Sequence, residues 1–409
     1  MIKQYKIIND PVHGFINIPG GVILEIIQHP LFQRLKEIKQ LGLTNLVYPG
    51  ACHTRLNHAL GAMHLMNEAV NNLRLKGVDI TEDEQEQAMA AILLHDVGHG
   101  PFSHALENVI LTGLSHEEIT LILMERINIE MGGRISMAIE IFKGEYKKKF
   151  LHQLVSSQLD VDRLDYLRRD SFFSGVAEGM IGHERIIKMM TVKKDNLVIE
   201  EKGIYSVEKF LISRRLMYWQ VYLHKTVIAA EQLIVEILRR ARELKSSGVE
   251  IPGSPALLYF MERSIDKSSV RDKDVMDMFA RLDDSDVMSA IKQWSLSNDS
   301  VLSVLCRMLV ERRLPRIQLS DTPYDGITFE AVKRELIDKS GLSQREASYF
   351  VKTGEVQNKG YDRGEENIRI LSKGGDEGDI YEISDMLSAK AFSQITKKYF
   401  LCTPKKYYF

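Results

Sequence analysis

The chain has 409 residues, of which 44% are hydrophobic and 27% charged, and its formal net charge is −2. This composition is typical of a folded globular protein, and the length allows two or three units of roughly 100–200 residues each. The near-neutral charge excludes a general attraction to nucleic acid, so a nucleic-acid partner is not expected. The three scattered cysteines, in no C-x-x-C pattern, argue against a disulfide framework and a thiolate metal site. Without a signal-like or membrane-spanning apolar run, the sequence predicts a cytoplasmic protein with no membrane partner.

The N-terminal region predicts a hairpin or extended arm followed by helices. The run YKIIND is typical of a strand, and turn residues follow at Asp10-Pro11 and Gly14. Residues 22–42 have apolar side chains at helical spacing, interrupted by Pro30 and closed by Gly42, which predicts two helices. A further helix is predicted over residues 56–75, close after Arg55.

The most informative stretch is AILLHDVGHGPFSH, residues 91–104. Its apolar run predicts a buried helix that ends at His95-Asp96, before glycines and a proline. Adjacent helical side chains point about 100° apart, so His95 and Asp96 can converge on one ion only near a helix end or with outside help. His58 lies upstream and Asp162 downstream. Two histidines and two carboxylates would bind a divalent ion such as Mn, Fe, Ni, Zn or Mg.

Simpler interpretations exist for each of these residues. A single histidine near a helix start is usually structural, and several carboxylates on one helix usually form a solvated face. The pattern Ser115 to Glu118 predicts a helix cap rather than a catalytic acid.

The second half of the chain predicts a mixed architecture. A hairpin is expected around Asp195-Asn196, then a long helical segment to residue 245. The break at 246–255 predicts a division into a catalytic unit, 1–245, and a C-terminal region, 256–409, that is helical and then α+β and serves oligomerisation or regulation. In that region GLSQREASYFVKTG predicts one helix, and the final aromatic run predicts an edge strand or subunit contact.

The motifs together resemble the metal site of the HD phosphohydrolase superfamily, in its deoxynucleoside triphosphate triphosphohydrolase branch. The resemblance rests on the quartet His58, His95, Asp96 and Asp162 and on the sequences HDVGHGPFSH and DVDRLDYLRRD, and it extends from about Lys6 to about Ala230. It implies a mainly α fold: an HD-domain helical core with a small β-hairpin and a mixed α+β C-terminal region. It also implies a homo-oligomer, dimer or tetramer, and a nucleotide activator.

The resemblance assigns roles to individual residues. The metal ligands would be His58, His95, Asp96 and Asp162, and the catalytic residues would be His99, His116 and the supporting Glu107. The substrate would be bound by Gln40, Leu41, Arg55, Arg163, Tyr166, Asp170, Arg214, Tyr218 and Tyr222. The chain departs from the family at Tyr218, where a histidine is usual, and at Gln28 and Lys36, where Asp and Arg read a guanine activator.

Three functions are compatible with these residues. The first is metal-dependent hydrolysis of deoxynucleoside triphosphates to deoxynucleoside and inorganic triphosphate. The second is an HD-type nucleotide phosphatase or phosphodiesterase acting on another substrate, and the third is a non-catalytic nucleotide-sensing HD protein. The residues themselves argue for a metal phosphohydrolase, whereas the substrate follows from the resemblance alone.

Overall fold

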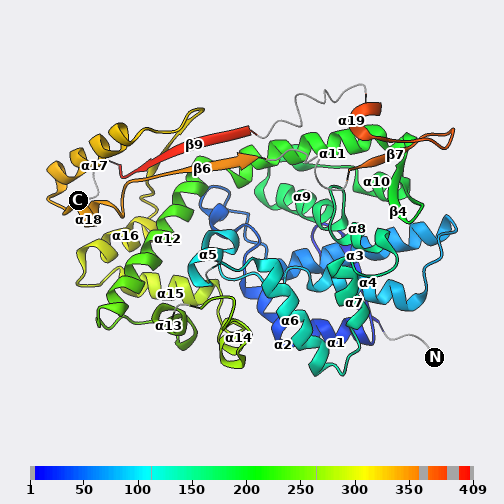
Figure 1. Cartoon of the computed structure of the whole chain (residues 1–409), viewed down its shortest axis with the longest axis horizontal. Helices are drawn as coiled ribbons and strands as arrows, with labels where there is room; N and C mark the ends of the chain where they lie inside the picture. The colour runs from blue at the N-terminus through cyan, green and yellow to red at the C-terminus, as the bar shows by residue number, and fades with distance from the viewer. Residues whose placement is uncertain (1–4, 112, 264, 359–366, 385–395, 406–409) are drawn as a thin grey trace.

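The computed structural model describes residues 5–111, 113–263, 265–358, 367–384 and 396–405, without the side chains of Tyr5, His104, Glu107 and Asn108. The fold is mainly α-helical with small sheets, as the sequence predicted (Figure 1). Within these ranges no helix is both long and apolar enough to cross a bilayer.

The N-terminal part begins with the predicted hairpin. Strands β1 (Tyr5–Asp10) and β2 (Gly14–Pro19) pair antiparallel, and Gly14 adopts the positive φ of 76° that the tight connection requires. The following elements are α1 (Val22–Gln28), α2 (Pro30–Gln33), η1 (Arg34–Glu37), η2 (Gly42–Leu46), α3 (Arg55–Leu75) and α4 (Glu82–Leu94). A capping box between Thr81 and Glu84 starts α4, and α4 ends at His95 as predicted.

The middle of the chain continues the helical core. Its elements are η3 (Ser103–Leu106), α5 (Glu107–Ile110), α6 (His116–Glu130), α7 (Ser136–Lys143), α8 (Lys149–Val155), α9 (Val161–Ser174), η4 (Ala177–Gly179), α10 (His183–Met189), β3 (Met190–Lys193), β4 (Asn196–Glu200), η5 (Glu201–Gly203), α11 (Ile204–Met217), the π-helical turn η6 (Tyr218–Tyr222) and α12 (Lys225–Ser246). The predicted hairpin at 190–206 is present as β3 and β4, and the cap between Ser115 and Glu118 is confirmed.

The C-terminal region is helical and then mixed, as predicted. It contains α13 (Pro255–Glu262), α14 (Lys273–Phe279), α15 (Asp284–Trp294), α16 (Ser300–Val310), β5 (Arg316–Ser320), α17 (Gly326–Ser340), α18 (Gln344–Ala347), β6 (Lys352–Asn358), β7 (Arg369–Leu371), β8 (Glu377–Asp379), α19 (Ile380–Ile383) and β9 (Thr396–Thr403).

Two predictions in this region were wrong in detail. The segment GLSQREASYFVKTG forms only the short helix α18, and its last residues enter β6 because they pair with β9. The strand β9 is central rather than an edge, since it lies between β5 and β6 in its sheet, and the alternative of a subunit contact stays a prediction. Tertiary pairing, which local sequence does not encode, decides both outcomes.

One contiguous apolar core runs through the molecule and includes side chains from both predicted units, from Ile16 to Tyr381. Figure 1 shows α12, in green, between the N-terminal helices and the α13–α16 group. The division at 246–255 stays a prediction. Inside the core, α3 packs against both α4 and α9, and this packing brings three distant sequence motifs together.

Candidate metal centre

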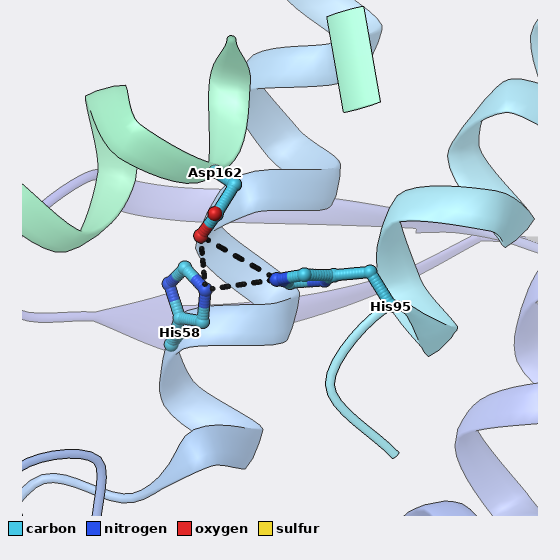
Figure 2. Close-up of side chains that lie close together, drawn as sticks. All are labelled: His58, His95 and Asp162. Carbon is cyan, nitrogen blue, oxygen red and sulfur yellow. Dashed lines mark hydrogen bonds and ion pairs between the residues drawn. The ribbon is translucent and has the colours of Figure 1, made fainter. Parts of the chain in front are cut away.

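Three helices supply the polar cluster at the heart of the molecule. His58 comes from the first turn of α3, His95 follows the end of α4, and Asp162 lies in the first turn of α9. Because α4 ends at residue 94, the backbone leaves the helix at this point and directs the His95 ring toward α3 and α9 (Figure 2). The apolar faces of these helices drive their packing, and the polar residues at their ends meet as a result.

The donor atoms of the cluster lie within one coordination sphere. The Nε2 atoms of His58 and His95 are 3.3 Å apart, and Asp162 Oδ1 lies 3.0 Å from the first and 3.4 Å from the second (Figure 2). Asp96 is adjacent, with its carboxylate oxygens 3.4 Å from His95 Nε2 and 3.8 Å from His58 Nε2. The structure thus groups three of the predicted ligands, His58, His95 and Asp162, with the fourth, Asp96, beside them.

The other ring nitrogens of the two histidines show that the cluster fits a metal ion. His58 Nδ1 donates to Asp165 over 2.8 Å, and His95 Nδ1 donates to the Ile92 carbonyl over 2.6 Å. In a neutral imidazole the lone pair is then on Nε2, the atom that points into the cluster. Such acceptors behind metal-binding histidines fix the ring orientation and strengthen the ligand.

Protons compete with a cation for this position. Burial lowers the pKa of His58, but the hydrogen bonds with Asp162 and Asp165 outweigh burial and raise the pKa to about 10. Burial also opposes the ionisation of Asp162, yet the two histidines hold its pKa below the ordinary value. Metal affinity should therefore increase with pH, because a bound cation must displace the imidazole proton.

A buried ionic layer supports the cluster from behind. Asp165, which is fully buried, accepts from His13 Nε2 at 2.6 Å and from Arg169 Nε at 2.9 Å. Arg169 also pairs with Asp10 at the end of β1, 2.7 Å away. The N-terminal hairpin is thereby connected to the ring of His58 by one path through His13 and Asp165 and by another through Asp10, Arg169 and Asp165. Asp165 thus orients a predicted metal ligand.

The loop after α4 has no room for a side chain at Gly98. A Cβ on Gly98 would collide with the backbone of His116 and Thr120. The Gly98 amide donates to Thr120 Oγ1 at 3.0 Å, and that hydroxyl donates to the carbonyl of His95. Arg34 holds the same loop by donating to the carbonyls of Val97 and His99. The backbone around His95 is therefore rigidly held.

The predicted catalytic histidines lie side by side on this loop and on α6. The rings of His99 and His116 have centroids 4.0 Å apart, and His99 Nδ1 is 3.3 Å from Asp96 Oδ1. Burial, and then the positive charge of Arg55, lower the pKa of His99 well below its usual value, so the ring is neutral. Glu107 begins α5, but its predicted supporting role concerns a side chain outside the described atoms.

A cavity of about 400 Å³ opens onto the cluster. Arg55 and Asp96 form an ion pair in its wall, and this pair holds the pKa of the Asp96 carboxyl well below its usual range despite burial. The Oε1 atom of Gln40 is buried and has no hydrogen-bond partner among the described residues. The predicted site residues that line this cavity are Gln40, Leu41, Arg55, Asp96, His99, His116, Asp162, Tyr166, Asp170, Tyr218 and Tyr222.

Comparisons with known proteins agree with this arrangement. Residues 55–170 match the HD domain family, and residues 181–250 match the HD associated region. The chain is 52% identical to a phosphohydrolase of known structure from Bacteroides thetaiotaomicron, with a TM-score of 0.95 over 98% of this chain and 100% of that one. The chain belongs to the HD-domain family of phosphohydrolases.

Two more distant relatives are also similar in sequence to this HD-domain phosphohydrolase. Protein YwfO of Bacillus subtilis is 36% identical over 76% of this chain and 72% of its own length. The Dictyostelium discoideum homolog of deoxynucleoside triphosphate triphosphohydrolase SAMHD1 is 31% identical over 58% of this chain and 50% of its own length. These relatives confirm the resemblance drawn from the motifs, while the substrate of this chain stays a prediction.

Two predicted phosphate contacts of this HD-domain phosphohydrolase lie outside the cavity wall. Arg163 Nε donates to Asp160, the N-cap of α9, at 3.1 Å. Arg214 is buried and donates to Gln158 at 3.2 Å. A role for either in phosphate binding stays a prediction and would require its side chain to turn toward the substrate.

Several residues of the site were missed by sequence reasoning. Ser103 Oγ accepts from Arg55 Nη2 at 2.7 Å, and both Phe102 and Ser103 have positive φ. Asp284, from α15, accepts from the backbone amides of Lys39 and Phe102, so the C-terminal region anchors two segments of the cavity wall. No local motif marks Asp284, whereas Ser103 lies within HGPFSH and could have been found there.

Polar residues that the motifs did not single out lie in the cavity wall or bond to residues of that wall. His53 Nε2 bonds Asp170 at 2.8 Å, and Tyr222 donates its hydroxyl to the same carboxylate at 2.8 Å. Thr44 and Glu231 line the cavity as well. Because these residues come from separate elements, only the folded chain brings them together.

Proposed function

We propose that this HD-domain phosphohydrolase hydrolyses deoxynucleoside triphosphates to a deoxynucleoside and inorganic triphosphate. The observation that carries the proposal is that one cavity reaches the metal-type cluster at Asp162 and is also lined by Arg55, the paired histidines and a tyrosine wall. Its volume of about 400 Å³ lies within the range of roughly 300–1,000 Å³ typical of small-molecule sites. The SAMHD1-type relatives support the choice of substrate.

The cluster and its neighbours would divide the chemistry between them. His58, His95, Asp96 and Asp162 would hold one divalent cation, whose role is to activate water and to neutralise phosphate charge. Arg55 would bind nonbridging phosphate oxygens through its planar donor fork, with Ser103 and Asp96 fixing its orientation. In the reaction water oxygen bonds to the α-phosphorus, and the bond from that phosphorus to the sugar 5′-oxygen breaks.

The leaving 5′-oxygen requires a proton, and His99 is placed to supply it. Burial, and then the charge of Arg55, lower the pKa of His99 in the free protein. Negative phosphates bound at Arg55 would offset that effect and favour the protonated ring. His116, stacked at 4.0 Å, would restrict the orientation of His99. The pair would therefore act as a general acid only once the substrate is bound.

The tyrosine wall would select the sugar. The Tyr222 hydroxyl is held by Asp170, which His53 also binds, so this ring cannot easily move aside. The Tyr166 and Tyr222 rings meet edge to face with centroids 6.2 Å apart. A rigid ring against the 2′ position would exclude a ribose hydroxyl and favour deoxyribose.

The proposal is tested by incubating the full-length protein with each deoxynucleoside triphosphate and Mn²⁺, Fe²⁺, Ni²⁺, Zn²⁺ or Mg²⁺, and resolving the products by chromatography. The expected products are deoxynucleoside and intact triphosphate, and both should disappear in the double variant His95→Ala, Asp96→Ala. Normal turnover by that variant would refute the metal site.

Other product patterns would select another function. Orthophosphate that is lost in the double variant would favour a nucleotide phosphatase, and tight binding without turnover would favour a nucleotide sensor. The replacement of the usual histidine by Tyr218, which lies in the cavity wall, is the observation that favours the sensor. The homo-oligomer, the nucleotide activator and the cytoplasmic location stay predictions.

A further inference from the structure

Glu231 is an acidic side chain in the cavity that neither the metal cluster nor the proposed reaction uses. It lies on α12 where this helix packs against η2 and η3, and Leu41, Gly42 and Thr44 line the same cavity. Its side chain is mostly buried, with part of it facing the cavity. Among the described residues, its carboxyl has neither a hydrogen-bond donor nor a cationic partner.

The carboxyl is electrostatically separate from the metal end of the cavity. Burial alone raises the pKa of Glu231, to about 7, with no contribution from Arg55, Asp96 or Asp162. Charged groups within a few ångströms would contribute, as they do to the pKa of His58 and Asp96. Glu231 comes from α12, whereas the metal cluster comes from α3, α9 and the end of α4, so the two contribute different parts of the cavity wall.

The charge of Glu231 restricts what it can bind. A carboxylate repels phosphate oxygens, and the triphosphate has its own cationic site at Arg55 and the cluster. The remaining donors of a nucleotide are a sugar hydroxyl and the edge of the base. A buried carboxylate without a partner is costly, and two N–H donors would satisfy both of its oxygens.

We propose that Glu231 is a specificity-determining residue that binds the base of the substrate and selects guanine. This inference rests on the proposed function. Guanine presents two adjacent donors, N1–H and the 2-amino group, which match the two oxygens of a carboxylate. Adenine and cytosine present one donor beside an acceptor, and thymine presents one donor between two acceptors. Each of these edges would direct a lone pair at the carboxylate.

The test measures affinity directly, so that it does not depend on turnover. Binding of the triphosphates of deoxyguanosine, deoxyinosine and deoxyadenosine is measured by calorimetry at pH 8, where the Glu231 carboxyl is ionised, with a chelator present. We expect the guanine nucleotide to bind roughly ten- to a hundredfold more tightly than the adenine nucleotide, with inosine intermediate because it lacks the 2-amino group. Equal affinities would overturn the proposal.

The variant Glu231→Gln provides the second comparison. The amide offers one donor and one acceptor, so the preference for guanine should disappear and adenine binding should be retained or improved. Retained adenine binding also shows that the variant is folded. Equal weakening of all three nucleotides would instead indicate a sugar contact and overturn base selection. Glu250→Gln makes the same chemical change at an exposed residue beyond α12 and should leave all three affinities unchanged.

Turnover measured in parallel separates this inference from the proposed function. Selective guanine binding without release of triphosphate would refute the hydrolase and support the base contact. Release of triphosphate from every deoxynucleotide with equal affinity would refute the base contact alone.

Discussion

Replacing Glu231 with Gln should stabilise the folded protein at alkaline pH and change its stability little at acid pH. Burial raises the pKa of Glu231 from 4.5 to about 7, so the folded state binds the proton more tightly than the unfolded chain does. Ionisation of Glu231 therefore lowers the free energy of unfolding. This loss is absent below about pH 4.5, grows as the pH rises and is complete above pH 7. An uncharged amide of the same shape carries no such penalty.

The size of the effect follows from the two pKa values. They differ by about 2.5, and each pKa unit corresponds to ~1.4 kcal/mol, so ionised Glu231 costs about 3 kcal/mol above pH 8. Part of the side chain faces the cavity, where water reduces this penalty, so the figure is an upper limit. With an unfolding entropy of ~2.1 cal/mol/K per residue over 409 residues, the variant should melt up to about 3–4 °C higher at pH 8.

The assay compares melting temperatures of wild type, Glu231→Gln and Glu250→Gln at pH 5 and pH 8 by circular dichroism. The difference between Glu231→Gln and wild type should appear mainly at pH 8, and Glu250→Gln should follow wild type at both values. All other titrating groups cancel in this comparison. An equal shift at both pH values would show that packing rather than ionisation causes it, and the reasoning about Glu231 would be refuted.

Two further predictions concern the layer behind the metal cluster. Asp165→Asn should weaken binding of Zn²⁺ or Mn²⁺ to chelator-stripped protein by roughly 10–100-fold, because His58 Nδ1 loses its carboxylate acceptor; unchanged affinity in a metal titration would show that Asp165 does not orient the ligand. Gly61→Ala should lower the free energy of unfolding by roughly 3 kcal/mol or more, because the new Cβ would collide with the buried Asp165–Arg169 pair. Gly182→Ala, which meets no atom within 4 Å, is the matched control in denaturant titrations, and equal losses in the two variants would contradict the collision.

Local sequence predicted much of the fold because helical periodicity and caps act over a few residues. The end of α4 at His95 follows from the apolar run and the glycines after it, and the hairpin of β3 and β4 follows from its turn residues. The central position of β9 did not follow, since its neighbours β5 and β6 lie far from it in sequence. The helix predicted over GLSQREASYFVKTG is only the short α18 for the same reason, because its last residues pair with β9 as part of β6.

The sequence by itself determined the metal-type quartet, because spacing and residue type together identify a known motif. Only the tertiary structure decided what surrounds that quartet. Packing of α3, α4 and α9 places Asp165 behind His58, and α15 brings Asp284 to the cavity wall. Packing of α12 places Glu231 in the same cavity as Arg55, although 176 positions separate them. Contacts between distant segments depend on how whole helices pack, and no local pattern encodes that geometry.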